Sequence, residues 1–504
     1  MDANNKKNYV CLSDLHLGAA YSVLSKVDNN GRFSAGTASD NLKNLADGLA
    51  GLIPRVFDEP PVLVLLGDCL DFDFATMEDL AEAFKCLMQT LFKDRDRPLF
   101  DQNEIVVIPG NHDHRLWQYE KDRLFIQHYP DKGPRYHTTS LFDPQGIPSY
   151  FLNSLREQAL DRDDGPEIRL YYPNVGIRTS DQAEQQTRMV ILHHGHFVES
   201  LYRLMTQLHD LLAELLQQLA TDKAIPLVEQ LERDNGAWID FLWSSLGASQ
   251  RGADNASRLF DIMMDPAASH RYIRKLADQI CLYISQNYGI AAEAQIQIPQ
   301  AAGMTVKKLV IGLLETALGN TFQTERMAYH YLLTEAGIDG LRWYLSRPLR
   351  DEILKQRVYD SANIQPNVSF IFGHTHKPFQ DRLPVVGYTQ PVNIYNTGGW
   401  VLDDPGLISQ QGAAAMFIDK QCNVASLRLF QDPVNQHVAK VHAQGLGNGD
   451  EDNPLLKRMQ AALSTHEQAT CWLTFTNNIL DTLKQRATAM RDQFFDPGSD
   501  TGII

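Results

Sequence analysis

Histidines, aspartates and an asparagine follow five apolar, β-prone runs of this chain. The runs are YVCLSDLH at 9–16, VLVLLGDCLD at 62–71, EIVVIPGNHDH at 104–114, MVILHHGH at 189–196 and VSFIFGHTH at 368–376. The polar groups at their ends are Asp14, His16, Asp68, Asp71, Asn111, His112, His193, His194, His196, His374 and His376. Because the ends of several strands can hold side chains rigidly in one small volume, these groups are expected to converge.

The chemistry of this set is that of a divalent metal. Carboxylate, imidazole and amide oxygen together suit a hard or borderline ion, with Mn expected and Fe or Zn as alternatives. The set is too large for one ion. It fits two ions about 3.5–4 Å apart that share a bridging carboxylate and a water, as is used for in-line attack at phosphorus. Such a pair lowers the pKa of the bridging water, so that hydroxide is available near neutral pH.

Each motif alone has an ordinary structural interpretation. An Asp-x-His after a strand is more often a polar loop, and a Gly-Asp at a strand end is usually a turn. GNHDH at 110–114 and GHTH at 373–376 are more specific, because the histidines follow a glycine at the end of a strand. The remaining histidines are interpreted as solvated or capping residues: His128, His137, His209, His270, His330, His437, His442 and His466. Five motifs in order, each after an apolar run, favour a functional site.

The motif order resembles that of the calcineurin-like metallophosphoesterase superfamily. Its pattern is DxH, GDxxD, GNH(D/E), H often followed by Gly, and GHxH, which this chain has as DLH, GDCLD, GNHD, HHG and GHTH. NTGGW at 396–400 resembles a further segment of bacterial members. The resemblance covers roughly residues 8–196 and 366–430 and implies a four-layer α/β/β/α sandwich.

The resemblance also implies a role for each site residue. A first metal would be held by Asp14, His16, Asp68 and His376, and a second by Asp68, Asn111, His194 and His374, with Asp68 bridging. His112 matches the histidine that contacts the substrate phosphate and protonates the leaving group. Asp71 matches the acid that orients this histidine, and a general acid does need a fixed proton direction.

The fourth motif leaves alternatives open. HHGH offers His193, His194 and His196, and neighbours on a strand point to opposite faces. His194 is preferred because the ligand of the superfamily usually precedes the glycine directly. His193 is the alternate, and His196 either faces the substrate or has no role.

The expected reaction is hydrolysis of a phosphomonoester or phosphodiester of a small molecule or nucleotide. A nuclease of the same superfamily is one alternative. A nucleotide-sugar or lipid pyrophosphatase is another, because UDP-diacylglucosamine pyrophosphatases also carry a helical insert. Those enzymes, however, typically have arginine where this chain has His112, and their insert is much smaller. A scaffold without catalysis would have lost ligands, yet every ligand position is filled.

The elements that must position these residues fall into four segments. Residues 1–196 and 366–432 form the two parts of an α/β core, 197–365 an inserted all-helical cap, and 433–504 a linker and helical extension. Helices are predicted at Asn41–Leu52, at 114–128 and four times in the insert. A further helix is predicted after Thr76, which resembles the start of a capping box with Asp79 three residues later. A loop-rich segment with Pro130, Pro134, Pro144 and Pro148 is expected before the strand at 189–192. Pro454–Phe495 is helix-prone and expected to pack on the body or on a second chain, which would allow oligomers.

Composition restricts the partners and the compartment. The formal net charge of −16 disfavours nucleic acid, because affinity for phosphate backbones depends largely on Lys and Arg. Six cysteines without paired spacing predict free thiols in a reducing compartment. With no apolar run before the first strand and none long enough to span a bilayer, a cytoplasmic location without a transmembrane segment is expected.

Overall fold

The computed structural model describes residues 7–27, 33–34, 36–93, 97–129, 137–142, 145–180, 187–216, 227–247, 266–296, 303–315, 332–356, 364, 366–403, 410–431, 440–447, 450 and 452–495. The chain forms two compact units. The first comprises Met1–Gly195 and Asn363–Ile504, and the second comprises His196–Ala362. The second unit therefore interrupts the first in the sequence.

An eight-stranded mixed sheet organises the first unit, in the order β13-β12-β11-β1-β2-β3-β5-β4. The strands are β1 (Tyr9–Leu12), β2 (Val62–Leu65), β3 (Glu104–Val107), β4 (Ile147–Pro148), β5 (Glu167–Leu170), β11 (Gly412–Ile418), β12 (Val424–Gln431) and β13 (His442–Gln444). β1, β2, β3 and β5 are parallel, whereas β11 runs antiparallel to β1. The loops that leave β1, β2 and β3 therefore start at the same edge of the sheet.

A five-stranded sheet in the order β6-β7-β8-β10-β9 completes the strands. They are β6 (Asn174–Ser180), β7 (Thr187–His193), β8 (Asn367–Phe372), β9 (Phe379–Leu383) and β10 (Val392–Asn396). β7 and β8 are parallel, as are β8 and β10. The fourth and fifth motifs, which follow β7 and β8, consequently also share an edge.

The two sheets pack face to face. One buried cluster joins Val64 and Val106 of the first sheet to Leu192, Ile371 and Tyr395 of the second. A second cluster joins the other face of the eight-stranded sheet to helices. β2 is therefore covered on both sides, which is why it reads as an unbroken apolar run.

The helices of the second cluster include α1 (Asp40–Val56), α2 (Met77–Phe92) and α4 (Tyr150–Leu160). α3 (His114–His128) follows the third motif and matches the predicted helix residue for residue. Thr76 caps α2 as predicted, because its hydroxyl accepts from the Asp79 amide at 3.1 Å and donates to the Asp79 carboxylate at 2.8 Å.

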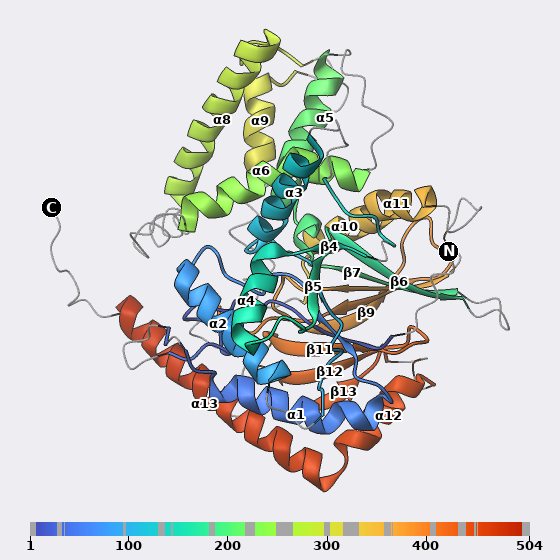
Figure 1. Ribbon diagram of the computed structural model, residues 1–504. Helices are drawn as coiled ribbons and strands as arrows, with labels where there is room; N and C mark the ends of the chain where they lie inside the picture. Colours follow the sequence, from blue (N-terminus) through green and yellow to red (C-terminus); the bar gives the residue numbers. More distant parts are fainter. Residues whose placement is uncertain are drawn as a thin grey trace. The chain divides into compact units, whose positions relative to one another are not determined.

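The C-terminal helices pack on the first unit. α12 (Pro454–Leu463) and α13 (His466–Phe495) cover the predicted helical stretch, and α13 lies along α1 (Figure 1). Trp472 packs directly on Gly48 of α1, where a Cβ would come within 2.5 Å of the indole ring. Of the two packing partners expected from the sequence, the body and a second chain, α13 packs on the body of its own chain.

The second unit is mainly helical in its described part, with one isolated β-bridge between Gln295 and Thr305. Its elements are η2 (His196–Val198), η3 (Ser200–Arg203), α5 (Leu204–Leu216), α6 (Leu227–Gly247), α8 (Pro266–Tyr288), α9 (Val306–Leu314), α10 (Glu335–Tyr344), the π-helical turn η8 (Leu345–Leu349) and α11 (Arg350–Lys355). The four predicted helices correspond to α5, α8, α9 and α10–α11, whereas α6 was not predicted. No helix among the described residues has the length and apolar content to cross a bilayer.

The expectation of a loop-rich segment before β7 was wrong for its second half. Pro130, Pro134 and Pro144 lie outside the described residues, but β4, α4, β5 and β6 follow them. Ser149 caps α4 by accepting from the Leu152 amide at 3.3 Å. These elements are short, so their periodicity was too brief to separate from that of a loop.

Candidate metal centre

Backbone hydrogen bonds join the loops that carry the motifs. The amides of Asp14 and His16 donate to the carbonyls of Gly67 and Asp68, each at 2.9 Å. The His112 amide donates to Asp68 Oδ1 at 2.8 Å. The His374 amide donates to Asp14 Oδ1 at 3.0 Å. The first two bonds join backbone to backbone, and the last two end on the carboxylates of Asp68 and Asp14. Together these bonds tie four of the five motifs to one another.

Glycines allow these loops to approach so closely. A Cβ at Gly110 would collide with Asp68 Oδ1, and one at Gly373 would collide with Asp14 Oδ2. Any side chain at either position would therefore displace a carboxylate of the site. This is the physical reason for the glycines of the GNH and GHTH motifs.

The side chains gather in three buried groups, each able to place its ligand atoms within 4.8 Å of one another. The groups are Asp14 with His16 and His376, Asp68 with His194 and His374, and His16 with Asp71 and His112. In the first, His376 Nε2 lies 3.4 Å from Asp14 Oδ1. In the second, His194 Nε2 lies 3.2 Å from Asp68 Oδ2.

Asp68 belongs to the second group and also lies close to the first. Its Oδ2 atom is 3.2 Å from His194 Nε2 and 3.8 Å from His16 Nε2. Asn111 joins the second group, with its Oδ1 atom 3.1 Å from His194 Nε2. The structure therefore brings the distant residues Asp14 and His376 together, and it brings Asp68 into reach of both groups.

The imidazoles are oriented as metal ligands would be. Nδ1 of His16 lies 2.8 Å from Asp71 Oδ2, and Nδ1 of His376 lies 2.6 Å from Asp403 Oδ2. Nδ1 of His194 lies 3.2 Å from the carbonyl of Leu66. In each ring an oxygen acceptor at Nδ1 leaves Nε2 directed at a carboxylate of the site, the arrangement typical of histidine ligands.

One buried nitrogen supports a metal here directly. Nε2 of His16 is buried and makes no hydrogen bond among the described residues. A buried polar atom without such a partner costs free energy unless an ion or water satisfies it. A divalent cation between this nitrogen and the carboxylates of Asp14 and Asp68 fits the donor set.

The electrostatics favour charged carboxylates. Burial alone would raise the pKa of Asp68, but His194, His112 and His16 together hold it well below its usual value. The pKa of Asp14 is likewise lowered, because His376 and His194 outweigh the effect of burial. Conversely, burial would lower the pKa of His194, and Asp68 raises it to about 9. The carboxylates are therefore ionised near neutral pH.

Strained backbone is concentrated in the same residues. The left-handed φ angles are 51° for Asp14, 46° for His16, 49° for Asp68, 70° for His374 and 56° for His376. Positive φ is uncommon for residues other than glycine and costs about 1–3 kcal/mol each. Such strain persists where surrounding interactions hold the backbone in place. Here the hydrogen bonds that backbone amides donate between the loops do so.

His112 lies in the third group, but its nearest carboxylate is not the expected one. Its Nδ1 atom is 3.8 Å from Asp71 Oδ1 and 2.8 Å from Asp73 Oδ2. Asp71 instead contacts His16 through Oδ2. Asp73 was not among the predicted site residues, since it falls outside the motif.

The three histidines of the fourth motif have different surroundings. His194 belongs to the second group. His193 stacks on Phe370 at 6.0 Å between ring centroids, and burial, followed by His194 and His374, holds its pKa well below the ordinary value. His196 is the first residue of the helical unit, with its ring 4.3 Å from that of Phe197.

Several partners of the site residues were missed. Besides Asp73, these partners are Tyr21, Asp403 and Asp113. The Tyr21 hydroxyl donates to Asp71, and Asp403 contacts His376. The Oδ2 atom of Asp113 accepts from the Cys69 amide at 2.8 Å. Asp113 also accepts from the Gly110 amide at 2.6 Å, so it joins the second and third loops. The Asp in GNHD was the one available signal for this role.

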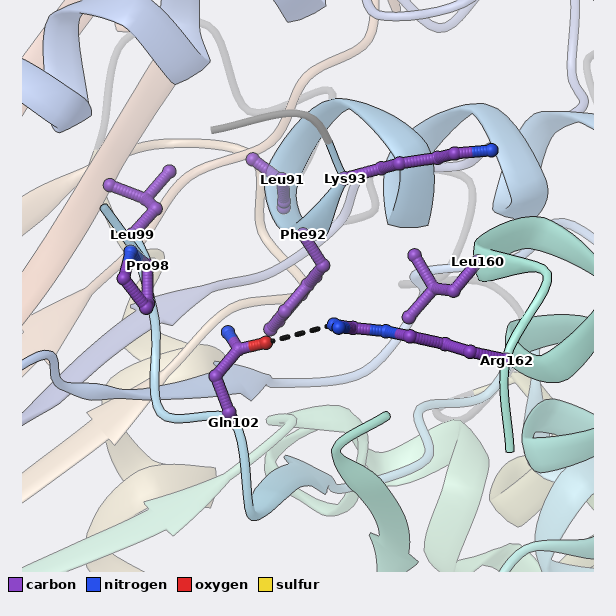
Figure 2. Close-up of a pocket in the computed structure, with 8 residues that line it drawn as sticks. All are labelled: Leu91, Phe92, Lys93, Pro98, Leu99, Gln102, Leu160 and Arg162. Atoms are coloured by element: carbon purple, nitrogen blue, oxygen red, sulfur yellow. Dashed lines mark hydrogen bonds between the residues drawn. The ribbon is translucent and has the colours of Figure 1, made fainter. Parts of the chain in front are cut away.

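A separate pocket of about 320 Å³ lies beside the end of α2 (Figure 2). Leu91, Phe92, Leu99 and Leu160 line it together with polar side chains, and Arg162 donates to Gln102 at 3.1 Å. The lining residues include none of the candidate metal ligands. The pocket is thus not part of the metal centre.

Comparison with protein families identifies a match in the first part of the chain. A family model described as calcineurin-like phosphoesterase matches residues 8–228. No curated protein matches the chain. The matched range contains the first four motifs, and the geometry above places the fifth motif beside them. Residues 8–228 thus carry a calcineurin-like phosphoesterase domain, which agrees with the superfamily that the motif order resembles.

Proposed function

We propose that this protein is a metal-dependent hydrolase of phosphomonoesters or phosphodiesters that uses two divalent ions. The observation that carries this proposal is that Asp68, a member of one buried group of carboxylate and imidazole ligands, also lies close to His16 of the other group. Metal-dependent phosphoester hydrolysis is the activity that the superfamily implies. Mn is the proposed metal, with Fe or Zn as alternatives.

The proposed ligands divide between two ions. Asp14, His16 and His376 would hold the first, and Asn111, His194 and His374 the second, with Asp68 shared. When bound, such ions polarise the phosphoryl group and supply a nucleophile near neutral pH by lowering the pKa of water. The protein contributes rigid placement, because the backbone bonds between the loops fix the ligands before any metal arrives.

His112 is proposed to donate a proton to the leaving group. Its amide is held by Asp68, and its ring lies 4.9 Å from that of His16, so it is adjacent to the proposed first ion. With Nδ1 facing a carboxylate, Nε2 is the atom available to the leaving oxygen. A positioned proton donor of this kind contributes about 10²–10⁴-fold to the rate.

The helical unit is proposed to act as a cap that limits access. It begins at His196, two residues after His194, and ends shortly before β8, which leads to His374. Both of its connections to the first unit are therefore close in sequence to proposed ligands. The four-layer α/β/β/α arrangement expected from the resemblance also stays part of this proposal.

The test is a metal count and a paired assay of the purified chain. We expect about two ions per chain and Mn-stimulated hydrolysis of p-nitrophenyl phosphate or bis-p-nitrophenyl phosphate. The ratio of the two rates identifies the monoester or diester class. Asp68→Asn should abolish turnover, and His112→Ala should reduce it by about 10²–10⁴-fold.

His466→Ala is a suitable control, because this histidine is exposed at the start of α13. It should leave both the metal content and the rate unchanged. A preparation that binds no metal and hydrolyses neither ester would contradict the proposed function.

A further inference from the structure

Two aspartates and two histidines meet beside the proposed first ion. Asp71 and Asp73 are both buried, and so are His16 and His112. The superfamily resemblance assigns Asp71 to His112 and gives Asp73 no role. The distances in the structure pair these four side chains differently.

Both oxygens of Asp71 are already engaged by other groups. Its Oδ1 atom accepts from the backbone amides of Asp73 at 3.1 Å and Phe74 at 2.9 Å. Its Oδ2 atom contacts His16 Nδ1 at 2.8 Å and accepts from the Tyr21 hydroxyl. Asp71 therefore fixes the ring of a proposed metal ligand and the turn that follows it.

Asp73 occupies the position next to His112 that Asp71 leaves open. Asp73 Oδ2 lies 2.8 Å from His112 Nδ1, an ion-pair contact without hydrogen-bond alignment, whereas Asp71 Oδ1 lies 3.8 Å from the same nitrogen. The amide of Asp73 is itself held by Asp71, so the turn sets where the second carboxylate points. The side chain of Asp73 is 5% exposed, which limits competition from water.

We propose that Asp73 is the positioning residue of His112, and that Asp71 positions His16 instead. This inference rests on the proposed function, in which His112 donates a proton from Nε2 and His16 binds metal through Nε2. A carboxylate at Nδ1 selects the tautomer and the ring direction that each task needs. The two aspartates then act on separate steps: Asp73 on departure of the leaving group, Asp71 on metal binding.

The test compares Asp73→Asn with Asp71→Asn, two isosteric changes in one turn. Metal affinity is measured by titration with Mn²⁺, and kcat/KM is measured on p-nitrophenyl phosphate and on phenyl phosphate, which has the poorer leaving group. Asp73→Asn should leave Mn²⁺ affinity unchanged and reduce kcat/KM about 10–100-fold on phenyl phosphate, with a smaller loss on p-nitrophenyl phosphate. Asp71→Asn should weaken Mn²⁺ binding about 10–100-fold and affect both substrates equally.

A readout that needs no activity is the Nδ1 proton signal of His112 in ¹⁵N-histidine-labelled, metal-free protein, identified by its absence in His112→Ala. We expect Asp73→Asn to shift it and Asp71→Asn to leave it in place. In kinetics, adding Asp73→Asn to His112→Ala should cause no further loss, because one residue acts through the other.

The inference is overturned if Asp71→Asn, and not Asp73→Asn, shifts the His112 signal or produces the dependence on the leaving group. The inference is also overturned if adding Asp73→Asn to His112→Ala lowers kcat/KM by the same factor as Asp73→Asn alone. Should Asp73→Asn not fold, Asp73→Ser replaces it in the same measurements. Failure of the proposed function is recognised separately, since the unmodified protein would then lack metal and turnover.

Discussion

Five proposed ligands of the metal centre have left-handed backbone conformations. From this strain we predict how substitutions at these positions change thermal stability. At His376, with φ of 56°, a Cβ is unfavourable, so His376→Gly should unfold at a higher temperature than His376→Ala in metal-free protein. The comparison is made by thermal unfolding with chelator present.

His193 provides the control, because it is a buried residue of strand β7. It is not among the described residues that have a positive φ angle. There the order should be reversed, with Ala more stable than Gly by about 0.5–1 kcal/mol. The same order at both positions would show that the backbone of His376 is not strained.

The titration of His194 predicts how metal-free protein responds to pH. Its pKa of about 9 in the folded state exceeds the ordinary value near 6.5, so its contribution to stability is complete below pH ~6.5 and is lost as pH rises through 9. The melting temperature should therefore fall between pH 7 and 9. Asp73 and Asp113, whose pKa values burial raises to about 6, complete their titration below this window.

The same proton competes with the metal. Because a ligand imidazole must be neutral, Mn²⁺ affinity should rise from pH 7 to 9, and binding should release a proton detectable by calorimetry in buffers of different ionisation enthalpy. His194→Gln should remove the fall in melting temperature of metal-free protein. A fall of equal size in that variant would mean that another group is responsible.

Among the residues, the sequence predicted the proposed ligands that gather in the buried groups better than the residues that contact them. Asp14, His16 and His376 each carry a local signal, because they directly follow a strand. Asp403, which contacts His376, and Tyr21, which contacts Asp71, lie in loops without a motif. Their roles depend on which loops meet in space, and a single sequence contains no local pattern for that.

Among the elements, α13 is connected to the loop after β1 by a buried arginine. Arg486 donates to the carbonyls of Ser22 and, at 2.7 Å, Ser25. Burial lowers the pKa of Arg486 to about 10, so it stays charged at neutral pH. Tyr21 belongs to the same loop, so the C-terminal helix supports a residue that contacts Asp71.

Removing this arginine should destabilise the protein. Arg486→Ala removes the arginine donor from the buried carbonyls of Ser22 and Ser25, although Ser22 still accepts from the Ser25 amide at 3.0 Å. The free energy of unfolding should therefore fall by about 1–3 kcal/mol, as measured by urea titration. Arg458→Ala is the matched control: this half-exposed arginine of α12 donates to Asp419 at 3.1 Å, and its loss should cost less than about 1 kcal/mol. Equal losses in both variants would contradict a special role for Arg486.

The elements show why some structure was predictable and some was not. The sequence predicted the bounds of α3 and the outer bounds of α12–α13, but not the break between α12 and α13 after Leu463. β5 and β6 were missed, because Glu167–Leu170 is short and Asn174–Ser180 mixes polar and apolar residues. Strand order was not predictable either, since β5 between β3 and β4 depends on tertiary packing.

For the whole molecule, the site comes from two distant parts of the chain. The part before the helical unit supplies Asp14, Asp68 and His194, and the part after it supplies His374 and His376. The family match ends at residue 228, before the second part begins. A fragment cut at that point would lack proposed ligands of both ions.

β1 lies between β2 and β11, and Tyr9 pairs with both Val62 and Ile418. During synthesis at about 5–20 residues per second, the ribosome delivers the second neighbour of β1 roughly 20–80 s after β1 itself. Until then the first unit has an open edge. The complete set of proposed metal ligands, which includes His374 and His376, can therefore form only after most of the chain has left the ribosome.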